Sequence, residues 1–258
     1  MDKMLYIAMS GAKQNMQALA INANNLANAK TTGFKADLSQ ARSMQAFGEG
    51  QPTRVFAMTE SASQNFDSGS LLTTGRPLDL AINGEGWFAV QTPEASYGAG
   101  LGGLGSGEAY TRQGNLRVTE DGTLETANGE LVLGDSGPII LPLPVNNIQI
   151  SADGTITVQP EGAPNTEQEE VGRIKLVNPD VRSLSKGSDG LFRRKDGQDE
   201  TADANVQVRG GTLETSNVNP LYEMTDMIAL QRQFEMQLKL MKTAEEIDAS
   251  SSSLLRTF

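Results

Sequence analysis

The sequence predicts a mainly β protein whose two ends are α-helical. Through the middle of the 258-residue chain, which contains 27 glycines, short apolar runs alternate with Asn-Gly and Asp-Gly turns. At each end, apolar residues instead recur at alternating spacings of three and four, the pattern of a helical heptad. Polar or turn-rich stretches separate both ends from the middle. We therefore expect four segments, 1–35, 36–75, 76–215 and 216–258.

The first expected helix lies within residues 1–35 and carries an uninterrupted a/d heptad seam. Two of its seam positions are alanines, which would let a neighbouring helix approach closely. The seam consists of Leu5, Met9, Ala12, Met16, Leu19, Ala23 and Leu26. The pattern ends at Thr31-Thr32-Gly33, because β-branched residues and a glycine favour the end of a helix.

Three asparagines, Asn24, Asn25 and Asn28, lie near the end of this helix. Asparagine is a poor helix former, and C-capping or a turn accounts for only one of the three. We expect the others to make polar contacts with other backbone segments. All three are therefore included in the predicted interface.

Asn219-Pro220 predicts the start of the second helix, because Asn is a favoured N-cap and Pro a favoured first helical residue. Glu223 then lies in the first turn, where the helix dipole favours an acidic side chain. Gln231 is the one polar residue in the expected seam. The apolar seam residues are Met224, Met227, Phe234, Leu238 and Met241.

Either seam could belong to an ordinary amphipathic helix that packs on its own domain. Two features favour an assembly interface instead: both helices lie at chain ends, and each is set apart from the β region. A single helix of this length is marginally stable alone, so each seam needs partners on more than one side. One chain offers mainly its other helix. We therefore predict that the two seams bind neighbouring subunits.

Residues 36–75 are polar, and we expect an extended or partly strand-like linker there. Beyond it, Asn83-Gly84-Glu85-Gly86 lies between the expected strands 78–82 and 87–91 and predicts a hairpin. Further strands are expected at 131–133, 139–141, 148–150, 156–158, 172–177 and 206–208. Strands this short with turns between them are typical of a sandwich or an irregular barrel.

Composition excludes several classes of function. The chain contains neither Cys nor His, so thiolate metal sites, disulfides and Ser-His-Asp triads are impossible. The formal net charge of −11 argues against nucleic acid as a partner. No stretch approaches the ~18–20 apolar residues of a membrane span, so no membrane insertion is expected. We expect no enzyme activity, no metal and no cofactor.

Three further motifs are predicted to be loops. Gly98–Gly107 matches G-x-G-x-x-G, but the residues that follow, 108–112, have a strand pattern, whereas a dinucleotide site needs a helix there. A hairpin insertion is the better interpretation. The acidic groups within 196–203 and 167–170 lack the ligand spacing of a calcium loop.

The N-terminus lacks the pattern of a cleaved signal peptide, which predicts a cytoplasmic protein or one exported by another route.

Several segments resemble the flagellar rod and hook protein family, and they do so in the family's order along almost the whole chain. ANNLAN and TTGFK resemble its N-terminal signature, and TGRPLDLAINGEGWFAV resembles its β-domain. The matching segments are 23–35, 74–90, 110–114, 121–134, 211–220 and 231–235. Within the family, the opening residues 1–12 are more similar to proximal than to distal rod subunits.

The resemblance implies a flagellar hook/rod-like β-domain, with both terminal helices pairing into one discontinuous coiled-coil domain. It implies a structural subunit of the proximal rod that assembles with copies of itself and other rod subunits. The resulting periplasm-spanning tube in the flagellar basal body transmits torque from motor to hook. It also implies export through the flagellar type III apparatus. A distal rod or hook subunit is the first alternative, and a secreted β-fold enzyme, adhesin or carbohydrate-binding protein is the remote one.

Overall fold

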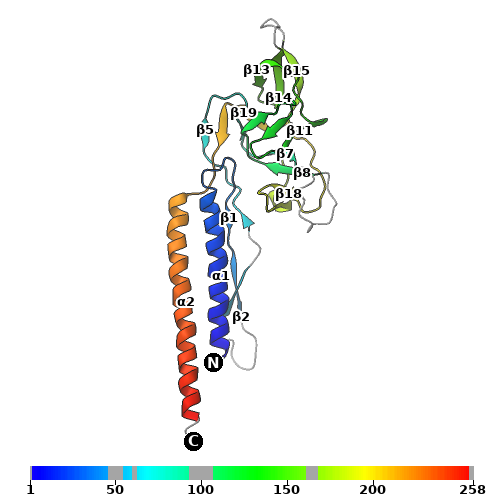
Figure 1. Ribbon diagram of the computed structural model, residues 1–258. Helices are drawn as coiled ribbons and strands as arrows, with labels where there is room; N and C mark the ends of the chain where they lie inside the picture. The colour runs from blue at the N-terminus through cyan, green and yellow to red at the C-terminus, as the bar shows by residue number, and fades with distance from the viewer. Residues whose placement is uncertain (1, 46–54, 60–62, 93–106, 161–167, 256–258) are drawn as a thin grey trace. The chain divides into compact units, whose positions relative to one another are not determined.

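The computed structural model describes residues 2–45, 55–59, 63–92, 107–160 and 168–255 (Figure 1). The chain folds into two compact units. We call the first, which comprises Met1–Ala29, Lys35–Asn65 and Val218–Phe258, the helical unit. We call the second, which comprises Lys30–Phe34 and Phe66–Asn217, the β body. Most of the segment Gly98–Gly107, and Glu167, lie outside the described residues.

The helical unit contains two long helices that run side by side, α1 (Asp2–Ala27) and α2 (Pro220–Leu255) (Figure 1). The side-chain oxygen of Asn219 accepts hydrogen bonds from the backbone N–H groups of Leu221 and Tyr222, at 3.1 and 3.4 Å. Asn219 is therefore the N-cap of α2, and the predicted start of this helix is confirmed. α1 ends at Ala27, before the glycine that was expected to terminate it.

Residues 36–75 were expected to form an extended or partly strand-like linker, and the described part of this segment contains five short strands. Four of them belong to the helical unit and form two small antiparallel ribbons, β1 with β4 and β2 with β3. β3 packs against α1. Their bounds are β1 (Asp37–Leu38), β2 (Ala41–Gln45), β3 (Val55–Thr59) and β4 (Ser63–Gln64).

The β body is built from antiparallel strands. Its largest sheet follows the order β17-β18-β8-β7-β11-β10-β9, with β12 on β11 and β16 on β7. A three-stranded sheet, β13-β14-β15, and two ribbons, β19-β6 and β20-β5, complete the unit. The bounds of the first eight strands are β5 (Leu71–Thr73), β6 (Leu80–Asn83), β7 (Trp87–Gln91), β8 (Glu108–Thr111), β9 (Leu116–Val118), β10 (Leu124–Thr126), β11 (Leu131–Gly134) and β12 (Gly137–Pro138). The others are β13 (Val145–Ile150), β14 (Thr155–Pro160), β15 (Glu169–Arg173), β16 (Leu176–Val177), β17 (Leu184–Lys186), β18 (Phe192–Arg194), β19 (Gln207–Gly210) and β20 (Thr212–Glu214).

Large apolar side chains fill the core of the β body. Leu80, Phe88 and Ile156 are at most 1% exposed and belong to one cluster that joins the sheets. A second cluster surrounds Trp87 and Phe192, whose ring centroids lie 4.7 Å apart. This core confirms the predicted mainly β fold with a helix at each end.

The hairpin predicted at residues 83–86 is wrong. β6 pairs with β19, whereas β7 pairs with β8, β11 and β16, so the chain changes sheets at this turn. Gly86 has a φ of +133°, and a Cβ atom there would lie 2.5 Å from Cγ1 of Val206. Gly86 therefore allows the chain to pack closely against Val206, where the sequence pattern indicated a hairpin.

The strand predicted at 139–141 is also wrong in its position. The paired residues are those of β12, Gly137–Pro138, and Ile140 makes only an isolated bridge with Thr123. Ile139 and Leu141 are buried while Ile140 is exposed. The side chains therefore alternate between buried and exposed as in a strand, although the backbone of this segment is irregular. The strand expected at 172–177 is divided between β15 and β16.

Candidate assembly interface

The two helices pack antiparallel in one continuous register. The Nδ2 atom of Asn22 donates to the Oδ2 atom of Asp226 at 2.5 Å, and Gly11 lies against the side chain of Gln237. Moving 11 residues along α1, from Gly11 to Asn22, therefore moves the contact back 11 residues along α2. Three residues further on, Asn25 contacts Glu223, three residues further back, at 3.5 Å.

The side of α1 that is buried consists of small and polar residues. A Cβ atom on Gly11 would lie 2.4 Å from Nε2 of Gln237, so the helices approach closely there. The buried residues of α1 are Ala8, Ala12, Gln14, Asn15, Ala18, Asn22 and Asn25. On α2, the buried and half-buried residues at heptad spacing are Glu223, Met227, Leu230, Phe234, Gln237, Met241 and Ala244.

The predicted seam of α1 lies mostly outside this contact. Met9 and Met16 are 57% and 61% exposed, and Leu5 and Ala23 are also exposed. Leu19 and Leu26 are half-buried, and Ala12 is buried. The structure therefore leaves a stripe of large apolar side chains on α1 that α2 does not cover.

On α2, the predicted seam is divided. Met227, Phe234 and Met241 are half-buried, whereas Met224 and Leu238 are exposed. The sequence prediction missed a second group of exposed apolar residues, whose signal was their own spacing of about one or two turns. Its members are Leu221, Tyr222, Ile228, Met236 and Leu240.

Of the three asparagines, Asn25 makes the expected contact with another backbone segment. Its Nδ2 atom donates to the carbonyl oxygen of Asp37, and its Oδ1 atom accepts from the N–H group of Asp37, both at 2.9 Å. The amide thus pairs with β1 as a neighbouring strand would. Asn28 donates to the carbonyl oxygen of Asn24 at 2.9 Å, a contact local to the helix end, and Asn24 is exposed.

The helix contact contains polar groups that are poorly satisfied. Burial raises the pKa of the Glu223 carboxyl, and the nearby Asp226 adds to this effect, while the hydrogen bond from Asn25 opposes it. Two buried side-chain atoms, Nδ2 of Asn15 and Oε1 of Gln237, have no hydrogen-bond partner. Because buried polar groups without partners are costly, this pairing is weaker than an apolar seam of the same length.

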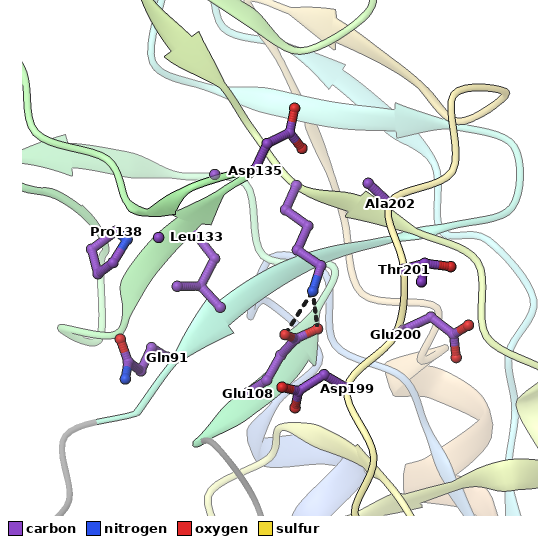
Figure 2. A pocket seen from close by; sticks show the side chains of 12 residues that line it. Gln91, Glu108, Leu133, Asp135, Pro138, Asp199, Glu200, Thr201 and Ala202 are labelled. Carbon is purple, nitrogen blue, oxygen red and sulfur yellow. Dashed lines mark hydrogen bonds and ion pairs between the residues drawn. The ribbon is translucent and has the colours of Figure 1, made fainter.

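The β body has a pocket of about 530 Å³, and its chemistry is acidic. Glu108 lies on one wall, and Asp199 and Glu200 lie on the chain segment opposite (Figure 2). The Nζ atom of Lys175 donates to both carboxylate oxygens of Glu108, at 3.0 and 2.7 Å. This lysine is therefore held in an ion pair with Glu108.

Among the described residues, no three or more acidic side chains are grouped so that they could hold a metal ion. Neither helix, over its described length, has the run of apolar residues needed to cross a membrane.

The chain matches known proteins over nearly its full length. Three family models match it: "Flagella basal body rod protein" at residues 5–35, "Flagellar hook protein FlgE/F/G D1 domain" at 81–158, and "Flagellar basal body rod FlgEFG protein C-terminal" at 209–254. It is 38% identical to the flagellar basal-body rod protein FlgF of Escherichia coli, with 99% of both chains covered. Identity is 35% with FlgF of Caulobacter vibrioides, over 97% of both chains. It is 31% with FlgG of Bacillus subtilis, over 96% of this chain and 97% of that one. The chain belongs to the flagellar basal-body rod protein family.

Proposed function

We propose that this protein is a structural subunit of the proximal part of the flagellar basal-body rod. Family membership supports the rod, and the higher identity to FlgF than to FlgG supports the proximal position. The subunit assembles with copies of itself and with other rod subunits into the tube that transmits torque from motor to hook. It has no enzymatic activity, binds no nucleic acid and does not insert into a membrane.

The observation that carries the proposal is the stripe of exposed apolar side chains on α1. Leu5, Met9 and Met16 are large, apolar and exposed along a helix whose opposite side is already occupied. Burying each of them against a neighbour contributes about 1 kcal/mol or more. A subunit interface therefore gives these side chains the burial that a single chain does not provide.

The two helices, in this proposal, form one discontinuous coiled-coil domain whose predicted seam faces neighbouring subunits. Their heptad spacing and antiparallel register support it. Export through the flagellar type III apparatus, without a cleaved signal peptide, belongs to the same proposal. So does a location in the periplasm-spanning part of the basal body.

The substitution Met16→Asp tests the interface. Because Met16 is mostly exposed, the variant keeps the helix content and stability of the free subunit, whereas a carboxylate buried between subunits prevents assembly. We expect cells that carry only this variant to be non-motile and to lack complete rods in isolated basal bodies. Gln17→Glu is the control, because Gln17 is exposed on the same helix outside the predicted seam and the change also adds one carboxylate. Normal swimming by the Met16→Asp cells would exclude this stripe as an interface.

A distal rod subunit is the alternative function, and the 31% identity to a FlgG protein over nearly the whole chain favours it. The two functions differ in the stage at which assembly stops when the protein is absent. Basal bodies from deletion cells that lack every rod part beyond the proximal segment support a proximal subunit. Basal bodies that retain part of the distal rod support the alternative.

A further inference from the structure

Arg112 and Glu214 form a buried ion pair in the β body. The Nη1 atom of Arg112 donates to the Oε2 atom of Glu214 at 3.0 Å, and the two side chains are 5% and 1% exposed. Replacing such a pair by apolar residues often leaves a protein equally stable, because removing two charges from water is costly. Burial of the pair is therefore weak evidence of a role in stability, and its other contacts indicate a further role.

Each member of the pair also binds a second backbone segment. The Nη2 atom of Arg112 donates to the carbonyl oxygen of Gly84 at 2.8 Å, and its guanidinium carbon lies 5.4 Å from the ring centroid of Trp87. The other carboxylate oxygen of Glu214 accepts from the N–H group of Gly69 at 2.9 Å. The pair thus joins the turn before β7 to the segment before β5.

The segment that follows α1 is held against the same two residues. The N–H group of Gly33 donates to the carbonyl oxygen of Glu214 at 2.8 Å. Gly33 has a φ of +68°, and a Cβ atom there would lie 2.3 Å from the carbonyl carbon of Arg112. Only glycine fits, both because of its backbone conformation and because of this close approach.

The segment that leads to α2 is fixed at the same place. Thr215 donates its N–H group to the carbonyl oxygen of Ser70 at 2.8 Å, and Nδ2 of Asn217 donates to that of Asp67 at 3.0 Å. A Cβ atom on Gly69 would lie 1.9 Å from the carbonyl oxygen of Thr215, so these backbones are in direct contact. Three chain segments, 33–34, 67–70 and 214–217, are therefore bound together around the pair.

These segments contain or adjoin the covalent connections between the two units. The chain passes between the units on either side of Lys30–Phe34, before Phe66 and after Asn217. We propose that Arg112 and Glu214 are positioning residues that fix the chain segments leaving the β body for α1 and α2. This inference rests on the proposed rod function. In that function, any force transmitted along the polypeptide between the β body and the helices must pass through these segments.

The test compares variants of this pair with variants of a second buried pair in the same unit. Lys175 and Glu108 are bonded at 2.7 Å, with side chains 17% and 6% exposed, and provide the control. We expect Glu214→Gln in the full chain to speed amide hydrogen exchange at Gly69 by about tenfold to a hundredfold, because Gly69 loses its charged hydrogen-bond acceptor. Exchange at Gly33 should also rise, because its acceptor is the backbone carbonyl of residue 214, which the variant side chain holds less firmly. Cells with this variant should lose motility. Glu108→Gln, the same change in the control pair, should leave exchange at both glycines unchanged and should preserve swimming.

Arg112→Lys covers the case in which Glu214→Gln does not fold. Lysine keeps the charge opposite Glu214, but its single ammonium cannot reproduce the fork that also reaches Gly84. We expect a folded β body, faster exchange at Gly69 and impaired swimming. Unchanged exchange at Gly33 and Gly69, or normal swimming by Arg112→Lys cells, overturns the positioning role. Loss of motility in Met16→Asp cells of the same strain would still support the rod function. Failure of the positioning role can therefore be distinguished from failure of the rod function.

Discussion

The β body and the helical unit bury opposite kinds of side chain. In the β body, large apolar side chains such as Leu80 and Phe88 are enclosed almost completely. In the helical unit, Ala and Asn side chains are buried along α1 while Met9 and Met16 face outward. The β body therefore encloses its largest apolar side chains, whereas α1 buries mainly its small and polar side. This difference supports the proposal that the helical unit binds neighbouring subunits.

The largest difference between the units should appear on truncating a phenylalanine in each. Phe88→Ala removes a ring that is 1% exposed, and we expect it to lower the free energy of unfolding of the β body by about 3–5 kcal/mol. Phe234→Ala removes a half-buried ring from the helix contact, and about 1–2 kcal/mol is expected there. Hydrogen exchange of amides in each unit under increasing urea measures both. Equal losses would contradict the contrast between the units.

A smaller effect on stability is expected from adding a methyl group to Gly11, where α1 and α2 approach closely. Gly11→Ala gains helix propensity of up to about 1 kcal/mol, because Gly is a poor helix former. The atom in its way is Nε2 of Gln237, the end of a flexible side chain whose Oε1 atom has no partner, so it can move at little cost. We expect a modest rise in the thermal midpoint of helix melting in the free subunit. A clear fall would mean that Gln237 is held more firmly than its contacts indicate.

The smallest effect should be a dependence of the helix contact on pH. The pKa of Glu223 is raised above its usual value of 4.5 by burial, so the folded helical unit holds this proton more tightly than the unfolded chain does. Its contribution to stability is present below the unfolded pKa and is lost as the pH rises through the folded pKa. Acidification from neutral pH to about 4.5 should therefore strengthen this contact, relative to the variant Glu223→Gln, whose contact should not change. Thermal melting of both proteins across this range measures the difference, and identical profiles would exclude the effect.

The helices were predictable because their signals are local. Asn219 and Pro220 predicted the start of α2 correctly, since capping involves only the next few residues. Which stripe of each helix faces the other was not predictable from periodicity. A heptad pattern marks apolar positions such as Met9 and Met16, but close contact favours small residues such as Gly11 and Ala12. The role of the predicted seams in assembly, and the division of the chain at residues 35, 75 and 215, stay predictions.

In the β body, strand positions were more predictable than strand partners. Strands near 131–133, 148–150 and 156–158 are present because alternation and turns are local properties. The partners of β6 and β7 were mistaken, because pairing depends on residues more than a hundred positions away, such as those of β19. The pair of Arg112 and Glu214 was missed for the same reason. Both residues lie in segments that resemble the rod and hook family, which was the available signal.

Trp87 is the single tryptophan of the chain, and it lies in the β body, 3% exposed, between Phe192 and the guanidinium group of Arg112. Its fluorescence therefore reports on the β body alone, without a contribution from α1 or α2. Substituting Arg112 removes a cation from the face of the indole and should shift the emission spectrum, whereas changes confined to the helices should not. The protein thus carries its own optical probe beside the Arg112–Glu214 pair, and no label needs to be attached.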